Sequence, residues 1–437
     1  MLDLPGSVIL LFAAALPMAC AGLIMACINR LIPRIQRDSK PTLLCLVPSG
    51  FEEIIEKGVG WMIEQRTAGG FFTRVHSVYY PSRAWGQVEW SPTQTVWKIP
   101  LLFRILRKWG FRMLFETGNG VGMFLLALAV SPWARRHVDI IRGQDPAIMG
   151  ILASWLSVLT GIPACISIHA DHGKRHALDP GSGSMTIWGR RRLASWIESI
   201  ALRSTDRVWV IRKSLIAWVE ERGVPKTRIR IFQHGIDPSR WVVSDTEQET
   251  FRKNQKLNKQ HLLLFVGRVD PVNYVEDILE MIRRLYTQRR DILLVLVGDG
   301  KLRSPLETQC RQEGSDRFIR WEGFQPADQV RLWRSVSAVQ LCLMGGFSLL
   351  EAAAAGRPII TYDVEWHSEV VSNNQTGILL PEHAIDLGVR EIHQLLDEPD
   401  RRAALGTAAR KRVQEAYAWP TIHKTHIEAY TELLQGK

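Results

Sequence analysis

The stretch SAVQLCLMGGFSLLEAAAAGRPIITYDV, residues 337–364, contains two apolar runs separated by a pair of glycines and an alanine-rich segment. The runs 337–344 and 358–363 have the length and composition of strands buried on both faces. The alanine-rich segment between them favours a helix. A strand, a helix and a second strand in this order predict a parallel βαβ unit, and therefore an α/β fold.

The same alternation of apolar runs and helical patterns extends over most of the chain. Comparable runs occur at 42–50, 138–143, 163–170 and 206–211, and again at 262–267, 292–298 and 317–323. The polar segment 244–260 separates these two series, and a chain of 437 residues is long for a single core. We therefore expect two domains with doubly wound parallel sheets, which bind ligands where the carboxyl ends of the strands meet a cleft.

The formal net charge of +11 predicts an anionic partner, such as a nucleotide, a phospholipid or a phosphorylated substrate. The charge also allows nucleic acid, but Arg190, Arg191 and Arg192 are more simply the solvated or lipid-facing side of a helix, so we expect no nucleic-acid partner. The six cysteines include no C-x-x-C pair, which indicates reduced thiols rather than disulfides or a zinc site. Because the sequence has neither a D-x-D motif nor a histidine cluster, we expect no metal and no cofactor.

The run from Val8 to Ile28 carries no charge and is long enough to cross a bilayer. Its basic neighbours follow the run rather than precede it, namely Arg30, Arg34, Arg37 and Lys40. This distribution predicts a single-pass anchor in the cell inner membrane, with the remainder of the chain in the cytoplasm. The alternative interpretation is a buried N-terminal helix.

A second segment, 96–115, interleaves basic and aromatic side chains. This composition is typical of a helix that lies at a membrane surface. An ordinary surface helix with one packed face gives the same pattern, so both interpretations stay open.

Two loops carry residues suited to an anionic ligand. Gly267 and Arg268 end a predicted strand, where a guanidinium can hold phosphate oxygens in a bidentate manner. The segment 345–348 lies at the start of a predicted helix, whose free N–H groups also favour an anion. Glu351 falls in the first turn of this helix, where it either caps the helix or accepts hydrogen bonds from a ribose.

Read in order, the stretches FVGRVDPV (265–272), LLVLVGDGKLRSPLE (293–307), GGFSLLEAAAAGRPIITYDV (345–364) and NNQTGILLP (373–381) resemble the nucleotide-sugar domain of the retaining glycosyltransferases of family 4. The N-terminal half is similar to that family's other domain, for example in VDIIRGQDPAIMG (138–150). The resemblance extends from about Thr42 to the C-terminus. It implies a GT-B fold, in which two Rossmann-like domains face a cleft.

The resemblance also implies a domain plan and a reaction. We expect a membrane anchor with a basic flank at 1–40, an acceptor-side domain at 41–243, a nucleotide-sugar-binding domain at 244–416 and a closing helix at 417–437 that returns to the first domain. The reaction implied is metal-independent, hexosyltransferase-like transfer from a nucleoside-diphosphate sugar in glycan biosynthesis. The expected acceptor is a saccharide or a lipid-linked or membrane-proximal molecule.

Residue roles follow from the same resemblance. Arg268 matches the family's basic residue on the donor diphosphate, and Glu351 matches the second acid of its E-x7-E motif, which binds the ribose. His169 matches a histidine that faces the donor from the first domain, and these three are the expected catalytic residues. The remaining expected donor contacts are Gly267, Phe324, Gly345, Gly346, Phe347, Ser348 and Leu349, and the expected acceptor-side loop is Ser49, Gly50 and Phe51.

The chain departs from the family pattern at two positions. Asn273 stands where the family usually has a lysine, and Leu343 stands in place of the first acid of the motif. Loss of a cation removes a charge-assisted hydrogen bond from the phosphate site, worth roughly 1.5–3 kcal/mol. The alternative function is therefore a non-catalytic GT-B homologue that acts as a scaffold in a polysaccharide assembly complex.

Overall fold

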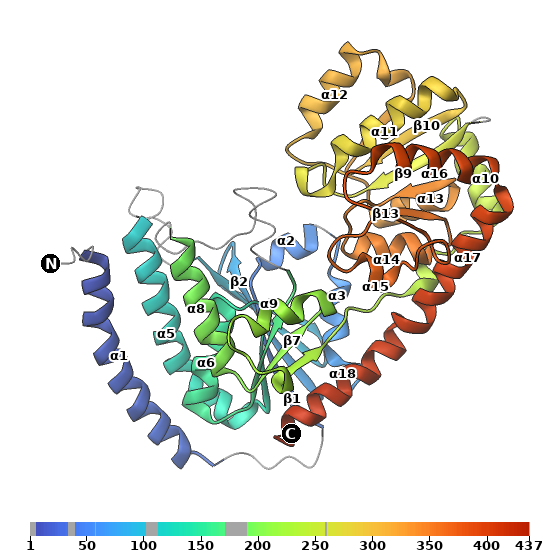
Figure 1. Cartoon of the computed structure of the whole chain (residues 1–437). Coiled ribbons are helices and arrows are strands. Elements are labelled where there is room, and N and C mark those ends of the chain that lie inside the picture. The colour runs from blue at the N-terminus through green and yellow to red at the C-terminus, as the bar shows by residue number, and fades with distance from the viewer. Residues whose placement is uncertain are drawn as a thin grey trace. The chain divides into compact units, whose positions relative to one another are not determined.

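The computed structural model describes residues 6–33, 40–56, 58–101, 112–170, 190–257 and 260–436. These residues form two α/β units (Figure 1). The first unit contains the described residues up to Phe232 together with those from His423 onward, and the second contains Gln233–Ile422. The helix α18 (Trp419–Leu434) therefore begins in the second unit and ends in the first.

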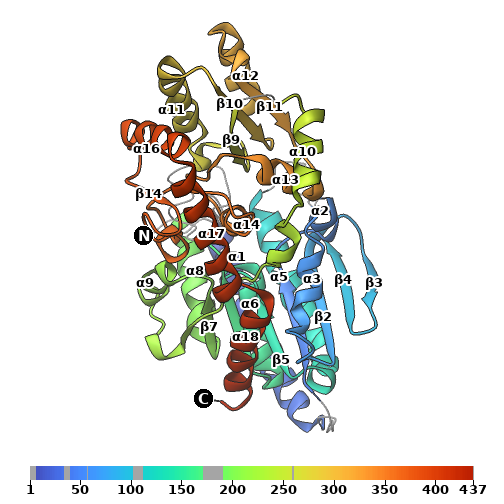
Figure 2. The ribbon, with the colours of Figure 1, turned by 90° about the vertical axis from the view of Figure 1, so that its right-hand side faces the viewer.

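The first unit is built on a sheet of eight strands in the order β3-β4-β2-β1-β5-β6-β7-β8, with β3 and β4 at one edge (Figure 2). Its strands are β1 (Thr42–Val47), β2 (Arg74–Ser82), β3 (Gly86–Ser91), β4 (Gln94–Pro100), β5 (Ile140–Gly143), β6 (Ala164–Ile168), β7 (Arg207–Val210) and β8 (Ile229–Ile231). Neighbouring strands are parallel except for β3 and β4, which are antiparallel. The strands predicted within 42–50, 138–143, 163–170 and 206–211 are confirmed.

Both faces of this sheet are covered, as the continuous apolar composition of its central strands predicts. Alternate residues of β1 point to opposite faces: Leu44 and Leu46 pack against α5 (Arg112–His137) and α6 (Ile148–Thr160), whereas Leu43 and Cys45 pack on the side of α18. The other helices of the unit are α2 (Phe51–Glu56), α3 (Trp61–Glu64), α8 (Arg191–Ser204) and α9 (Ile216–Glu220).

The predicted single-pass anchor over Val8–Ile28 is wrong, and with it the predicted placement in the inner membrane. The segment lies in α1 (Gly6–Leu31), but among the described residues no helix combines the length and the apolar character that crossing a bilayer requires. α1 instead packs beside α5 and α6 (Figure 1). Asn29 is fully buried at this contact, where its Nδ2 donates to Ser131 Oγ at 2.9 Å and to the Leu159 carbonyl at 3.0 Å.

The interfacial helix expected over 96–115 is also wrong in its first part, because residues 96–100 belong to β4. This strand pairs with β2 in parallel and with β3 in antiparallel orientation, and its Val96 is fully buried. Residues 102–111 lie outside the described part of the chain, and α5 begins at Arg112.

The second unit contains a six-stranded parallel sheet in the order β11-β10-β9-β12-β13-β14. Its strands are β9 (His261–Val266), β10 (Ile292–Val297), β11 (Ile319–Gly323), β12 (Val339–Leu341), β13 (Ile359–Tyr362) and β14 (Ile378–Leu380). The βαβ unit predicted for 337–364 is confirmed, since β12 and β13 pair in parallel and α14 (Phe347–Ala354) connects them.

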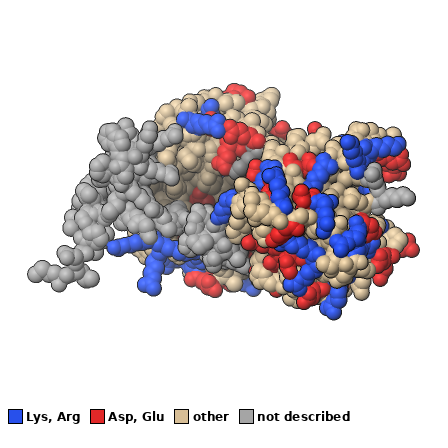
Figure 3. All heavy atoms as spheres, turned by 90° about the horizontal axis from the view of Figure 1, so that it is seen from above, with Lys and Arg blue, Asp and Glu red and all other residues tan. Residues whose placement is uncertain are grey.

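The remaining helices of the second unit are α10 (Asp245–Asn254), α11 (Val275–Gln288), α12 (Arg303–Gln312), α13 (Ala327–Val336), α15 (His367–Val370), α16 (Ile385–Asp397) and α17 (Pro399–Ala416). α11 packs against α16, and an ion pair joins the two helices: Arg284 Nη1 lies 2.7 Å from Asp386 Oδ1. On the face displayed in Figure 3, Lys and Arg side chains are interspersed with Asp and Glu. The excess positive charge is therefore not gathered into one basic patch on that face.

Candidate functional site

The strand order of the second unit changes direction between β9 and β12. β9 connects along the chain to β10 on one side of it, while β12 lies on its other side, with Leu263 opposite Val339. Ligands of open parallel sheets bind at such a switch point, outside the carboxyl ends of the strands. The loops at this point carry Gly267 and Arg268 after β9, and 345–348 after β12.

A hydrogen bond joins these two loops directly. The Ser348 hydroxyl at the start of α14 donates to the Val266 carbonyl at the end of β9, at 2.7 Å. The structure therefore brings together the two segments that the sequence singled out for an anionic ligand.

The Glu351 carboxylate has a cationic partner that the sequence analysis missed. Arg334 of α13 is only 1% exposed, and its Nη2 donates to Glu351 Oε2 and to Ser348 Oγ, both at 3.0 Å. Its Nη1 donates to Gln340 Oε1, and its guanidinium lies 5.5 Å from the ring centroid of Trp241. Arg334 follows Val330 by four residues and so shares the apolar face of its helix, which is the signal that could have identified it as buried.

This pairing fixes one side of the carboxylate and leaves the other for a ligand. The Glu351 side chain is 25% exposed, and no hydrogen bond of its Oε1 is found within the described residues. A carboxylate oxygen held in this way can accept hydrogen bonds from sugar hydroxyls. The ribose-binding role of Glu351 stays a prediction, and the E-x7-E pattern is incomplete.

In the loop 345–346 before α14, two aromatic side chains of the segment after β13 form hydrogen bonds with the backbone of Gly345. The Gly345 N–H donates to Nε2 of the fully buried His367 at 3.0 Å, and Trp366 Nε1 donates to the Gly345 carbonyl at 3.0 Å. Because Nε2 is an acceptor, the ring proton is on Nδ1, which has Thr361 Oγ1 at 2.6 Å and the Tyr362 carbonyl at 3.0 Å. These contacts connect His367 to both the loop and β13, so its ring orients the loop.

Position 345 requires glycine because the loop passes directly over a buried thiol. A Cβ at Gly345 would lie 2.4 Å from Cys342 Sγ, far inside van der Waals contact. Burial raises the pKa of Cys342 to about 11, so this thiol is neutral and acts as a packing group. At Gly346, by contrast, an added Cβ would meet nothing within 4 Å.

Replacing His367 with phenylalanine is expected to weaken the binding of a nucleoside diphosphate about 3- to 10-fold, because the loop loses a hydrogen bond of about 0.5–1.5 kcal/mol that orients Gly345. Isothermal titration calorimetry would measure the affinity. The matched control is His393→Phe, a change at an exposed histidine of α16 in the same unit, which pairs with Asp397. Equal affinities of the two variants would show that His367 does not orient the loop.

The loop after β9 shows what replaces the family's lysine. Asn273 Nδ2 donates to the Arg268 carbonyl at 2.6 Å, so this amide holds the backbone of the loop. The Arg268 side chain is 57% exposed, and its Nη1 lies 2.9 Å from Asp270 Oδ2. The backbone of Gly298, at φ +141°, lies against the backbone of Gly267 in this loop. A Cβ at position 298 would lie 1.8 Å from the Gly267 carbonyl oxygen.

Three other expected donor contacts of the second unit differ in their exposure. Phe324 follows β11 and is exposed, as a residue that stacks on a base must be. The Phe347 ring lies 5.1 Å from the ring of His234. The Leu349 side chain is fully buried in the core, so only its backbone can be near the loop. The binding roles of all three stay predictions.

The remaining expected site residues belong to the first unit. His169 is half-buried and follows β6, and the loop Ser49–Phe51 follows β1. In that loop, a Cβ at Gly50 would lie 2.6 Å from the Pro81 carbonyl oxygen, and the Phe51 N–H donates to Ser82 Oγ at 3.2 Å. The predicted roles of these residues toward donor and acceptor stay predictions.

The chain matches two sequence families. Residues 60–235 match "Glycosyl transferase 4-like domain" and residues 246–412 match "Glycosyl transferases group 1". The glycogen synthase of Mycobacterium tuberculosis is 26% identical over 304 residues, which cover 68% of this chain and 70% of that protein. Alpha-maltose-1-phosphate synthase of Mycolicibacterium smegmatis is 23% identical over 305 residues, which cover 65% of this chain and 76% of that protein.

Solved structures share the fold over nearly the whole chain. Anabaena HepE, solved in complex with UDP, has a TM-score of 0.67 at 14% identity and covers 90% of this chain and 100% of its own. Sucrose-phosphate synthase from Thermosynechococcus elongatus has a TM-score of 0.68 at 17% identity and covers 91% of this chain and 100% of its own. These two similarities concern the fold alone.

Proposed function

The chain is a glycosyltransferase of family 4 with the GT-B fold, and from this premise we propose that it transfers the sugar of a nucleoside-diphosphate sugar, with retention of configuration and without a metal, to a lipid-linked acceptor and releases the nucleoside diphosphate. The observation that carries the proposal is the arrangement at the switch point of the second unit. There the Arg334–Glu351 pair lies beside the open start of α14 and the loop of Arg268.

The donor half of the reaction uses charge rather than a covalent step. Arg268 and the N–H groups at the start of α14 bind the diphosphate and stabilise the negative charge that develops as the sugar leaves. Glu351 accepts hydrogen bonds from the ribose through Oε1, while Arg334 holds Oε2. In this scheme the acceptor attacks from the side of the leaving group, so no side-chain nucleophile is needed.

Similar proteins support a nucleotide donor. The Anabaena structures were solved with UDP and with UDP-glucose. The two mycobacterial relatives are named for the synthesis of glycogen and of maltose 1-phosphate, which indicates that sugar transfer is the common chemistry. We propose that the donor here is likewise a nucleoside-diphosphate sugar.

Thermal unfolding of the full chain with UDP, GDP, ADP and dTDP tests the donor site. A ligand at a hundred times its dissociation constant is expected to stabilise the protein by about 2.7 kcal/mol. Arg268→Ala is expected to lower the affinity for the nucleotide that stabilises the parent protein about tenfold, because one solvent-exposed, charge-assisted contact is lost. The matched control is Arg284→Ala, which removes an exposed arginine of α11 in the same unit and leaves the affinity unchanged.

The same experiment separates the enzyme from the scaffold. The scaffold alternative is motivated by Asn273, which supplies a backbone contact where the family has a cation, and by Leu343. A folded protein that none of the four nucleotides stabilises would contradict the proposed donor site and favour the scaffold. A nucleotide whose effect depends on Arg268 would contradict the scaffold.

A further inference from the structure

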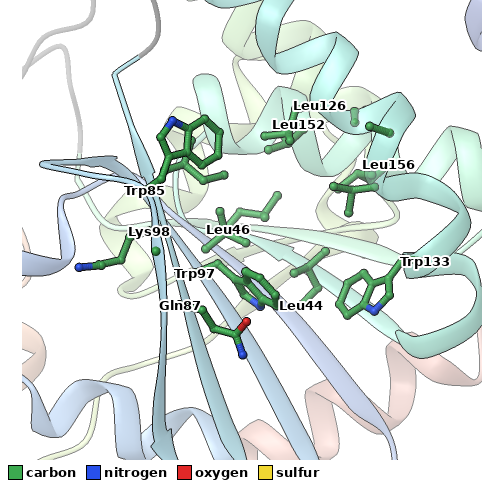
Figure 4. Close-up of a pocket in the computed structure, with 16 residues that line it drawn as sticks. Leu44, Leu46, Trp85, Gln87, Trp97, Lys98, Leu126, Trp133, Leu152 and Leu156 are labelled. Carbon is green, nitrogen blue, oxygen red and sulfur yellow. The ribbon is translucent and has the colours of Figure 1, made fainter.

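Two cavities in the described part of the chain differ in what they can recognise. The larger, of about 580 Å³, lies in the first unit, and Figure 4 shows leucine side chains such as Leu46 and Leu152 across this space from one another. The ammonium of Lys98 points away from the space and pairs with Glu52. These apolar walls do not specify a ligand. The smaller cavity, of about 250 Å³, lies in the second unit and brings two arginines together.

The smaller cavity lies at the edge of the second sheet opposite the expected donor site. Its lining residue Arg357 comes just before β13, and Ser335 comes shortly before β12, so both lie near the amino ends of these strands. The donor loops follow the carboxyl ends of β9 and β12. α14 has Ser348 near its beginning, whereas Ala355, directly after its end, lines the cavity. None of the residues that line the cavity belongs to the expected donor site.

The Arg357 guanidinium is held at the cavity by uncharged acceptors. Its Nη2 donates to Gln248 Oε1 at 2.7 Å and to the Ser335 carbonyl, and both partners line the same cavity. Among the described residues, no carboxylate lies within ion-pair distance of this guanidinium, and its Nε and Nη1 make no hydrogen bond. Burial lowers the pKa of Arg357, and the positive charges of Arg410 and Arg402 lower it further. This guanidinium therefore lacks a counter-charge.

The Arg410 guanidinium, from α17, lines the same cavity and is held in a similar way. Its Nε donates to the Ala354 carbonyl at 3.0 Å and its Nη2 to the Ala355 carbonyl at 2.7 Å, both at the end of α14. Glycine at position 356 permits this approach, since its φ is +70° and a Cβ there would lie 2.6 Å from Arg410 Cζ. Within the part of the chain that the structure describes, Arg410 has no carboxylate partner either.

The two guanidiniums together suit a small oxyanion. Both are fixed by backbone or amide oxygens, and both retain N–H groups that these contacts do not use, a geometry that matches phosphate oxygens. The cavity is smaller than the range of about 300–1,000 Å³ that is typical of drug-sized ligands, so the ligand is small. Asp245, at the start of α10, also lines the cavity, and its charge partly offsets that of Arg357 without forming an ion pair.

We propose that this cavity binds a phosphate group, either free phosphate or that of a small phosphate ester, between Arg357 and Arg410. The site goes beyond the proposed function, because it lies apart from the donor loops and does not depend on nucleotide binding. Charge-assisted hydrogen bonds from both guanidiniums hold the anion, which supplies the counter-charge that they lack.

Calorimetric titration of the full chain with inorganic phosphate and with glycerol 3-phosphate, at low ionic strength, tests this site. Tighter binding of the ester would identify a phosphorylated metabolite as the ligand, and tighter binding of inorganic phosphate would identify free phosphate. A folded protein that binds neither would overturn the proposal.

A pair of variants in α17 locates the binding. Arg410→Met is expected to weaken phosphate binding about tenfold or more, because one charged donor is lost. The matched control is Arg412→Met, because Arg412 also donates to two backbone carbonyls, those of Val370 and Glu369, but does not line the cavity. Equal affinities of the two folded variants would overturn the assignment.

A second variant tests the site without removing an arginine, and it decides the question if Arg410→Met does not fold. Asp245→Asn removes an exposed negative charge beside the two guanidiniums, so phosphate is expected to bind about fivefold more tightly. Asp400→Asn is the matched control, since Asp400 is likewise exposed in the first turn of a helix but lies outside the lining. An affinity of Asp245→Asn that equals that of Asp400→Asn would contradict the proposal.

Arg268→Ala separates this site from the donor site, which is also proposed to hold phosphate groups. Phosphate binding that depends on Arg410 should persist in Arg268→Ala. Phosphate binding that is lost in Arg268→Ala and kept in Arg410→Met would place the anion at the donor loop and overturn this inference alone. Binding that depends on Arg410, in a protein that no nucleotide stabilises, would overturn the proposed donor site and leave this one standing.

Discussion

Replacing Glu351 with glutamine is expected to lower nucleotide affinity about 10- to 100-fold. A hydrogen bond to a charged group contributes about 1.5–3 kcal/mol, and the amide of glutamine keeps the shape but not the charge. The same change is expected to destabilise the second unit by about 2 kcal/mol, because the Arg334 guanidinium is buried and loses its carboxylate partner. Calorimetric titration and urea unfolding would measure the two effects.

A matched control for this change is Glu247→Gln. Glu247 pairs with Arg331 of α13, the same helix that carries Arg334, but this pair is partly exposed to solvent. Exposed ion pairs contribute about 0–1 kcal/mol, so the control should unfold almost as the parent does. If Glu351→Gln binds nucleotide as tightly as Glu247→Gln, Glu351 serves only to stabilise the helix start and not to bind the ribose.

The contrast between Glu351 and Arg334 shows what the sequence could and could not predict about the site. The strand, the glycine pair and the first turn of α14 are consecutive in the chain, so their local order predicts a loop for an anion. Arg334 precedes Glu351 by a strand and a loop, and only the packing of α13 against the sheet places its guanidinium under the carboxylate. The partner of a charged residue is a tertiary property that spacing alone does not reveal.

The prediction of secondary structure was limited in the same way, because burial by tertiary packing cannot be read from local sequence. Strands buried on both faces were predicted because they are continuous apolar runs. β2, β3 and β4 were not predicted, since polar residues interrupt them and β3 lies at an exposed edge. The N-terminal run failed for a related reason: apolar composition describes a helix packed against other helices as well as one in lipid. The buried Asn29 side chain, which donates hydrogen bonds to Ser131 and to the Leu159 carbonyl, is typical of a helix packed against other helices.

Replacing Tyr430 with phenylalanine is expected to destabilise the first unit by about 2–3 kcal/mol. Tyr430 lies on α18, and its hydroxyl accepts a hydrogen bond from Arg142 Nη1 at 3.0 Å, while Arg142 Nε donates to Ser167 Oγ at 2.8 Å. Burial raises the pKa of the Tyr430 phenol, so its oxygen is a neutral acceptor. No carboxylate lies within ion-pair distance of Arg142 in the part of the chain that the structure describes.

The expected loss of stability arises because the buried Arg142 guanidinium has few hydrogen-bond acceptors around it. The Arg142 guanidinium lies 4.4 Å from the ring centroid of Phe232, so a cation–π contact supplies part of its stabilisation. Loss of the Tyr430 hydroxyl removes a hydrogen bond to a charged group, worth about 1.5–3 kcal/mol, whereas the phenylalanine ring keeps the contacts with Phe72 and Trp209. The deficit is therefore electrostatic and not a cavity.

Urea unfolding of Tyr430→Phe beside Tyr286→Phe measures this effect. Tyr286, in the second unit, stacks on Phe318 with ring centroids 3.7 Å apart, and its hydroxyl makes no hydrogen bond within the described residues, so its loss should change stability by less than about 0.5 kcal/mol. Equal stabilities of the two variants would mean that ring packing alone docks the end of α18. The expected difference would instead show that a buried arginine of β5 fastens the helix on which the chain returns to its first unit.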